Sequence, residues 1–140
     1  MNRIFQDNNG TVESLNGRKL SSLKCLYNDD HESEDVILFW LQTDENWLRI
    51  FIDGVYCGID EYDNDESQSD LEADDDTRLV NHDSWIKDNC IDQIIVESTD
   101  LPIITLSILL SNKSSIILAC DKNEICTLKT DDIPHEMSYM

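Results

Sequence analysis

Short apolar runs separated by polar turns dominate the chain, and this spacing is typical of β-strands rather than of helices. In the first half the expected strands cover 23–27, 36–42, 47–52 and 55–59. The dipeptide Asp53-Gly54 lies between the last two runs. It is a strong signal for a two-residue hairpin turn. The first half is therefore predicted to form an antiparallel meander.

The second half shows a similar succession of apolar runs. Strands are expected at 77–80, 90–97, 101–110, 115–120 and 124–129. Pro102 stands at the start of its run, where a missing backbone N–H is tolerated. Short helices are expected only across Thr11–Leu15 and at a turn capped by Asp83-Ser84. The predicted fold class is mainly β, a β-rich α+β protein with at most short helices.

Through their best-matching part, the two halves superpose without gaps at an offset of 68 residues. Leu41 to Trp47 then lies over Leu109 to Ser115, and Asp53 lies over Asp121. Leu23 likewise lies over Ile91, and Leu26 over Ile94. The alternatives to a true repeat are chance and the generic spacing of β-meanders. A true repeat predicts two similar meander halves that form a sandwich or one bent sheet.

The predicted organisation is a single domain over residues 1–140. Its two β units cover about 17–59 and 77–129, and an acidic loop over 60–76 joins them. Ten of the 17 residues in this loop are acidic and none is basic. Isolated carboxylates lose too much hydration when buried. The loop is therefore expected to be solvated, to bind cations, or to meet a basic partner.

The overall charge narrows the choice of partners. The chain has 30 acidic and 10 basic residues and a net charge of -20. Nucleic acids and anionic membranes both need a cationic protein surface, so neither is an expected partner. A basic protein surface is the favoured partner, and solubility alone is the alternative explanation of the charge.

The five cysteines are scattered and include no C-x-x-C pair. Most lie in apolar runs, where reduced cysteine behaves as a small hydrophobic residue. This pattern favours a reducing compartment over a disulfide scaffold. The N-terminal residues have no apolar core typical of a signal peptide, and no run approaches the about 20 residues of a membrane span. We expect a soluble, cytoplasmic protein.

The acidic loop is a candidate metal site because it is rich in oxygen ligands. An EF-hand loop that started at Asp63 would place Asp65, Ser67 and Asp74 at ligand positions. Gln68 would then replace the required glycine, and the final bidentate glutamate is missing. Weak, nonspecific Ca²⁺ or Mg²⁺ binding is the more plausible reading, so no metal site and no cofactor are predicted.

Catalytic motifs are absent from the sequence. There is no nucleophile elbow, phosphate loop or dinucleotide fingerprint, and the chain has only four glycines. His31, His82 and His135 are widely separated. Cys120 and Cys126 could face one another across a turn, but their apolar neighbours favour core cysteines over zinc ligands. We predict that the protein is not an enzyme.

Aromatic residues divide into core and surface candidates. Phe39 and Trp40 lie inside an apolar run and are expected in the core. Trp47 begins a strand beside polar residues, so it could be half exposed. Tyr62 and Trp85 lie in polar, acidic sequence, which is typical of interface anchors with a charged rim. The alternative is that each packs back onto the sheet and fixes its loop.

The run from Trp47 to Gly54, followed by Asp60-Glu61-Tyr62 and an acidic loop, resembles a known type of small protein. It is similar to the acidic bacterial immunity proteins found beside polymorphic toxins, including those of contact-dependent growth inhibition. The resemblance covers roughly 17–129. It implies a cytoplasmic protein that binds the C-terminal domain of a cognate toxin one to one and neutralises it. It also implies that this domain is often a nuclease with a basic cleft. The high net charge favours a monomer.

The predicted partner-binding residues combine the acidic loop with nearby aromatic anchors. They are Asp60, Glu61, Tyr62, Asp63, Asp65, Glu66, Asp70, Glu72, Asp74, Asp75, Asp76, Trp47 and Trp85. If the loop takes no part, the binding surface would lie on the sheet around Trp47, Tyr56 and Trp85. The alternative function is an acidic module that binds divalent cations, or a general protein-interaction module without catalysis.

Overall fold

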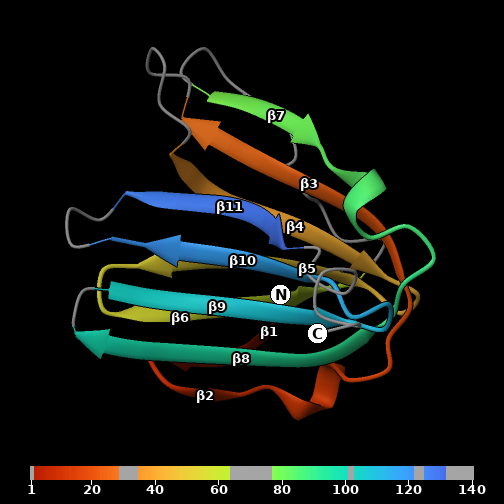
Figure 1. The fold of residues 1–140 in the computed structure, drawn as a ribbon, viewed down its shortest axis with the longest axis horizontal. Coiled ribbons are helices and arrows are strands. Elements are labelled where there is room, and N and C mark those ends of the chain that lie inside the picture. Colours follow the sequence, from red (N-terminus) through yellow and green to blue (C-terminus); the bar gives the residue numbers. More distant parts are fainter. Residues whose placement is uncertain (1, 29–34, 64–76, 101–102, 122–124, 132–140) are drawn as a thin grey trace, which may run out of the picture.

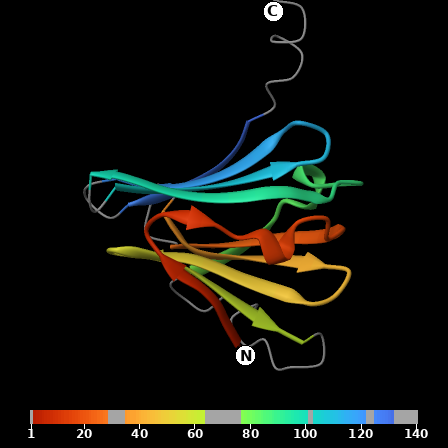
Figure 2. The same cartoon turned by 90° about the horizontal axis from the view of Figure 1, so that it is seen from below.

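The fold is a sandwich of two antiparallel β-sheets, which Figure 2 shows edge-on as two layers. It was obtained as a computed structural model that describes residues 2–28, 35–63, 77–100, 103–121 and 125–131. The helices in these segments are single 3-10 turns. The predicted class, a mainly β sandwich with at most short helices, is confirmed. No helix within these segments is long and apolar enough to cross a membrane.

The larger sheet, sheet A, has six strands (Figure 1). In spatial order they are β1 (Asn2–Asp7), β6 (Tyr56–Tyr62), β5 (Trp47–Asp53), β4 (Val36–Thr43), β3 (Leu20–Asn28) and β7 (Thr77–Asn81). Sheet B has five strands, in the order β11 (Cys126–Asp131), β10 (Ser115–Cys120), β9 (Ile103–Leu110), β8 (Ile91–Asp100) and β2 (Gly10–Thr11). The 3-10 turns are η1 (Glu13–Leu15) and η3 (Asp83–Trp85).

The same order of elements occurs twice along the chain. After β1, which has no counterpart among the described strands of the second half, each half has a short strand (β2 or β7) and a 3-10 turn, and continues as a four-stranded meander. The short strands are exchanged, because β2 pairs with β8 of the second half and β7 pairs with β3 of the first. The two halves are therefore related by an approximate two-fold axis.

Reciprocal hydrogen bonds mark this axis. The Leu20 amide donates to the Asn89 carbonyl at 2.9 Å, and the Ile91 amide donates to the Arg18 carbonyl at the same distance. Lys19 and Cys90 form an isolated antiparallel bridge between them. In these two hydrogen bonds, the donor and the acceptor of one half thus have their counterparts in the other half.

The pairing corrects part of the alignment expected from the sequence. Leu23 pairs with Leu41 in sheet A, and Ile94 pairs with Ile108 in sheet B, so Leu23 corresponds to Ile94 rather than to Ile91. The offset of 68 holds only from β5 and β10 to the following turn. The offset changes in the strands before β5 and β10, because the connections between those strands differ in length in the two halves.

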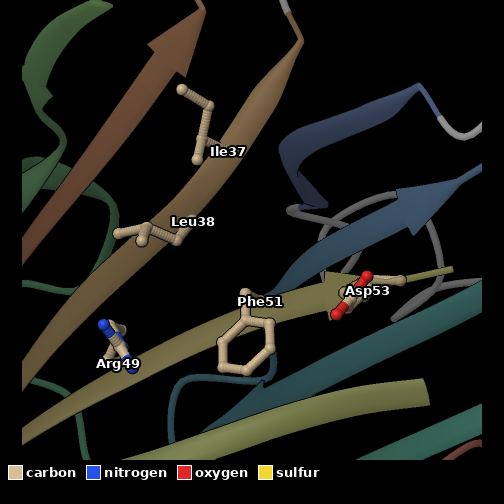
Figure 3. Close-up of a pocket in the computed structure, with 6 residues that line it drawn as sticks. Ile37, Leu38, Arg49, Phe51 and Asp53 are labelled. Atoms are coloured by element: carbon tan, nitrogen blue, oxygen red, sulfur yellow. The ribbon is translucent and has the colours of Figure 1, made fainter.

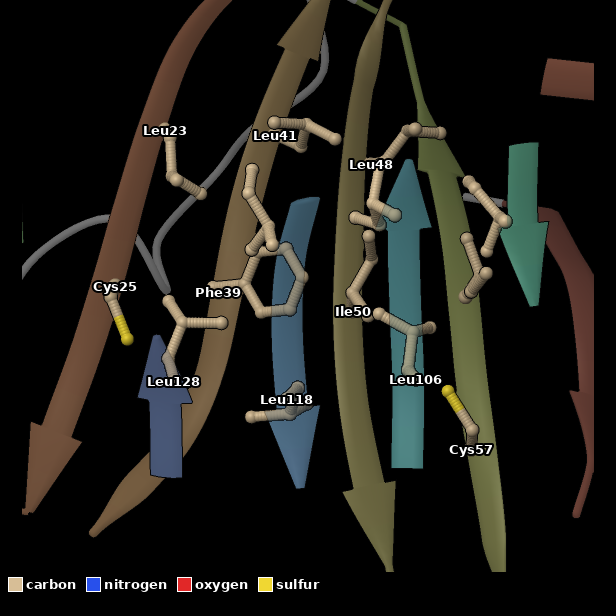
Figure 4. Close-up of a cluster of buried hydrophobic side chains, with 14 of the residues drawn as sticks. Leu23, Cys25, Phe39, Leu41, Leu48, Ile50, Cys57, Leu106, Leu118 and Leu128 are labelled. Carbon is tan, nitrogen blue, oxygen red and sulfur yellow. The ribbon is translucent and has the colours of Figure 1, made fainter. Parts of the chain in front are cut away.

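The main core lies between the sheets. Figure 4 shows Phe39 and Ile50 of sheet A facing Leu106 and Leu118 of sheet B, and all four are fully or almost fully buried. In β9 every second residue is buried, which is the period expected of a strand with one face against a core. Truncating such a side chain to alanine typically costs about 2–5 kcal/mol. The alternating pattern therefore identifies the face of β9 that points inward.

Two features of the chain were not expected from its sequence. The N-terminal residues form strand β1, which pairs with β6 and covers that edge of sheet A. Cys120 and Cys126 form a disulfide between facing positions of β10 and β11, so the expectation of reduced cysteines is wrong for this pair. Cys25 and Cys57 are free and buried, and burial raises the pKa of each thiol to about 12.

Candidate partner-binding face

Charged and aromatic side chains gather on the outer face of sheet A, which is turned away from sheet B. In β5, Leu48 and Ile50 point into the core, and the residues between and beside them point outward. We call this surface the arginine–aromatic face. It consists of Arg3, Trp40, Trp47, Arg49, Phe51, Asp60 and Tyr62.

Asp60 is the centre of this face. Register places it directly opposite Arg3 of β1 on one side and Arg49 of β5 on the other. The Arg49 guanidinium donates to Asp60 Oδ2 from Nη2 at 2.6 Å and from Nε at 3.2 Å. Arg3 Nε forms an ion pair with Asp60 Oδ1, and this hydrogen bond is the main cause of a raised Arg3 pKa.

The burial of Asp60 contradicts the prediction that the acidic loop begins there. Strand β6 continues to Tyr62, and the Asp60 side chain is 0% exposed. Two guanidinium groups replace the hydration that an isolated carboxylate would lose, so its burial is tolerated. Asp60 therefore holds three strands together and offers no free charge to a partner.

Trp40 lies at the middle of the aromatic residues. Its ring makes edge-on contacts with Trp47, at a centroid distance of 6.1 Å, and with Tyr62, at 5.1 Å. Trp40 is 1% exposed and Trp47 is 8% exposed. Trp40 is thus buried as expected, but on the outer face rather than between the sheets. The expectation of a half-exposed Trp47 is wrong, because Trp40 and the neighbouring strands cover it.

Arg49 connects the ion pairs with the aromatic rings. Its guanidinium carbon lies 5.5 Å from the Tyr62 ring centroid and 5.8 Å from that of Phe51. Arg3 approaches the Phe51 ring at 5.2 Å. These distances suit cation–π interactions. The charged and aromatic groups therefore hold one another in place, which lowers the entropy lost if a partner binds them.

Gly58 leaves the space that the Phe51 ring occupies. The two residues are directly opposite in β5 and β6. A Cβ atom on Gly58 would lie 2.4 Å from Phe51 Cζ, closer than any real contact. The glycine therefore allows the ring to lie flat across the neighbouring strand.

A pocket of about 320 Å³ opens beside Phe51, where β4 and β5 separate (Figure 3). It is lined by Ile37, Leu38, Arg49, Phe51, Ile52 and Asp53. The β4–β5 ladder ends at Phe39 and Ile50, although both strands continue. We call this opening the fork pocket.

A β-bulge explains why the strands separate. Leu26 and Tyr27 of β3 pair with Leu38 and Val36 of β4, so Ile37 is an extra residue. Such a bulge bends the strand that carries it. Near the start of β4, Asp35 Oδ1 accepts a hydrogen bond from the Cys126 amide of sheet B at 3.1 Å. The beginning of β4 is thereby held toward β11 and away from β5.

Glu61 lies near the C-terminal end of β6, away from the fork pocket, and is held there by Arg18. Arg18 Nη1 donates to Glu61 Oε2 at 3.0 Å and to Asn46 Oδ1 at 2.9 Å. Burial alone would raise the pKa of the Glu61 carboxyl, but hydrogen bonds from Asn46 and Arg18 outweigh it and lower the pKa. Glu61 is therefore also tied into the fold, at the end of the sheet where Trp47 begins β5.

Trp85 does not join the other predicted anchors. It lies in η3, packs partly against the main core and stacks on His82 at a centroid distance of 3.9 Å. His82 Nε2 in turn lies 2.9 Å from the Tyr27 hydroxyl. Because η3 follows β7 at the far edge of sheet A, Trp85 is separated from Trp47 and Tyr62 by several strands.

The remaining predicted residues fall at or beyond the end of β6. Asp63 is exposed. Seven others lie outside the described residues, namely Asp65, Glu66, Asp70, Glu72, Asp74, Asp75 and Asp76. Most of the imperfect EF-hand match lies there too. In the segments that the structure does describe, no three His, Cys, Asp or Glu side chains are grouped so as to hold a metal ion.

The sequence interpretation missed Arg3, Arg49 and Phe51. Two of them could have been found, because Arg49 and Phe51 alternate with apolar residues in a predicted strand and must share its outer face. Arg3 could not, because its strand was not recognised. No family model, no curated protein sequence and no solved structure matches this chain.

Proposed function

We propose that the chain is a non-catalytic immunity protein that binds the C-terminal domain of a cognate bacterial toxin and neutralises it. The observation that carries the proposal is the unequal distribution of charge over two similar sheets. The connections 29–34 and 64–76, which both join strands of sheet A, contain eleven acidic residues and no lysine or arginine. The connection that corresponds to 29–34 in sheet B is the uncharged Leu101-Pro102.

The arginine–aromatic face supplies what charge alone lacks. Opposite fields speed association, to about 10⁸–10⁹ M⁻¹s⁻¹ at low salt, but affinity depends on buried anchors. Aromatic and arginine side chains are the most common anchors at protein interfaces. Tyr62 and Phe51 are partly exposed and already fixed by contacts with Arg49. They would meet the partner at low entropic cost, while the carboxylates draw it in.

The identity of the partner rests on the resemblance to immunity proteins. A toxin that cleaves nucleic acid needs a cationic cleft for phosphates. Carboxylates that occupy this cleft would exclude the substrate without any chemical step. An inhibitor that only fills the toxin's cleft needs no catalytic group. The arginine–aromatic face is consistent with this, because its charged residues form ion pairs with one another.

Co-expression with the C-terminal domain of a toxin encoded beside this chain tests the proposal. We expect a one-to-one complex that survives gel filtration at moderate salt and an inhibited toxin. Free elution of both proteins would contradict it. The contribution of charge is tested by the triple variant Asp74→Asn, Asp75→Asn, Asp76→Asn. We expect a slower association rate and a weaker dependence of that rate on salt.

A matched control separates local charge from net charge. Asp88, Asp92 and Glu97 are exposed acidic residues of the second half. The variant Asp88→Asn, Asp92→Asn, Glu97→Gln changes net charge by the same amount but leaves the sheet A connections intact. We expect it to alter association less than the first variant. Equal effects would mean that overall charge, rather than the sheet A surface, directs the encounter.

A further inference from the structure

We propose that the fork pocket is the site where sheet A receives an arginine or lysine side chain of its protein partner. The pocket would hold the aliphatic stem of that side chain, and the Asp53 carboxylate at its rim would pair with the cationic group. The inference deepens the proposed function, on which it rests for the source of the side chain.

The fork pocket is specific to sheet A. The corresponding strands of sheet B, β9 and β10, remain paired through Cys120 and Ile104. Sheet B also has an irregular register at this end, but there the extra residue is Thr99 of β8. β9 therefore keeps a regular antiparallel pairing with β10 to the end of that strand. In sheet A the extra residue is Ile37 of β4, which turns away and opens the sheet.

The lining suits a side chain that is apolar along its stem. Ile37, Leu38, Phe51 and Ile52 form the apolar part of the wall. Lysine and arginine bury their methylene groups on such surfaces and keep the charged group at the rim. Ile37 is 40% exposed, which is unusual for a large apolar residue of this protein. A partner's methylene groups would cover it.

The two charged residues of the lining are not equivalent. Arg49 directs Nε and Nη2 to Asp60, so its charge is compensated within the sheet. Asp53 is exposed, and its carboxylate accepts a bond of 3.4 Å from the neutral Tyr56 hydroxyl. No cation of the described segments pairs with Asp53. The uncompensated charge at the rim is therefore negative, and it favours a cationic group over a carboxylate.

Short peptides test the pocket without the toxin. The probe is acetyl-Gly-Arg-Gly-amide, compared with the norleucine peptide, which has only the stem, and with the glutamate peptide. NMR titration of the full-length protein should show saturable shifts at Leu38, Phe51 and Asp53 with the arginine peptide. Shifts with the other two peptides should be weaker. An equal response to all three peptides, or no saturable shift at these residues, would overturn the proposal.

Asp53→Asn and Asp121→Asn form a matched pair of variants. Asp121 follows β10 as Asp53 ends β5, so both substitutions remove one charge from the same turn position of a different sheet. Asp53→Asn should weaken binding of the arginine peptide about 2- to 5-fold, as expected for an exposed ion pair. Asp121→Asn should leave it unchanged. Thermal unfolding confirms that each variant folds, and equal binding by both variants would refute the role of Asp53.

The peptide and toxin experiments fail independently. Peptide binding without a toxin complex would support the pocket and reject the immunity function. A toxin complex that is equally tight for both variants, with no peptide binding, would retain the proposed function and reject the pocket.

Discussion

Sheets A and B share one framework and differ in what they present to solvent. Their inner faces are interchangeable in character, since Ile50 of β5 and Leu118 of β10 are both apolar and almost fully buried. On the outer face, sheet A has the cross-strand row Trp40, Arg49 and Asp60. The equivalent row in sheet B is Ser107, Ile117 and Lys129.

The difference between the outer faces shows which residues of sheet A the fold itself requires and which it does not. Core packing restricts the inner faces to apolar residues, and both halves obey it. Sheet B shows that the framework can form with a serine, an isoleucine and a lysine in this row. The buried ion pairs of sheet A are thus not demanded by the fold, and buried ion pairs add little stability compared with apolar replacements. We infer that they serve to fix the arginine–aromatic face in one arrangement.

The largest expected effect comes from breaking the central ion pairs. Asp60→Ala leaves Arg3 and Arg49 close together without their common carboxylate. Breaking a buried pair costs about 3–5 kcal/mol, and we expect about 3 kcal/mol here because both arginines are partly exposed. Urea unfolding measures the loss. Lys129→Ala, at the equivalent position of sheet B, should change the free energy of unfolding by less than about 0.5 kcal/mol. Equal losses would contradict a special role for Asp60.

A smaller effect is expected where Phe51 crosses Gly58. Gly58→Ala forces the ring away, and overpacking of this kind costs about 1–3 kcal/mol. Because the end of the ring can tilt, we expect a loss near about 1 kcal/mol, together with changed NMR signals from Phe51 and the fork pocket. Thr127 faces Ala119 at the equivalent place in sheet B. Thr127→Ala should leave the pocket signals unchanged, and a Gly58→Ala variant with wild-type signals would disprove the close contact.

The smallest effect concerns Asp83 at the junction of the halves. Burial would raise the pKa of its carboxyl, but hydrogen bonds from the Leu23 amide, Asn81 and Ser22 outweigh burial and lower the pKa below its usual value. The ionised form therefore stabilises the folded state. This contribution is complete above the unfolded-state pKa of about 3.9, and it is lost as the pH falls through the lower folded-state pKa.

Asp83→Asn should accordingly flatten the acid limb of stability. Unfolding free energies measured by urea from about pH 5 down to about pH 2 should fall less steeply in the variant than in the wild type. Glu13 has the equivalent place in η1, and its carboxylate makes no hydrogen bond with the described part of the chain. Glu13→Gln should keep the wild-type slope. If both variants behaved alike, the Asp83 contacts would not be the source of the pH dependence.

The sequence by itself determined most of the strands, and it determined the inner face where apolar residues alternate, as in β9. It did not determine the inner face of β4, whose apolar run is continuous, so Trp40 was expected in the core but lies on the outer face. Asp53-Gly54 fixed a hairpin through a local signal. The recurring order of runs also revealed two similar halves. What a local pattern cannot contain is the partner of each strand, so the exchange of β2 and β7 and the edge strand β1 were decided by long-range pairing.

The candidate site also combines features visible in the sequence with features that only long-range pairing decides. The acidic composition near Asp60 was visible in the sequence, but whether a carboxylate is solvated or buried depends on cations brought from other strands. Arg3 is distant in the chain and reaches Asp60 only through the β1–β6 pairing. The fork pocket depends on a single bulged residue, Ile37. It is a bulge only because β3, the strand paired with β4, has no residue opposite it. Composition thus set the charge of this protein, and tertiary pairing decided which of the described charges are neutralised and which stay exposed, as Asp60 and Asp53 show.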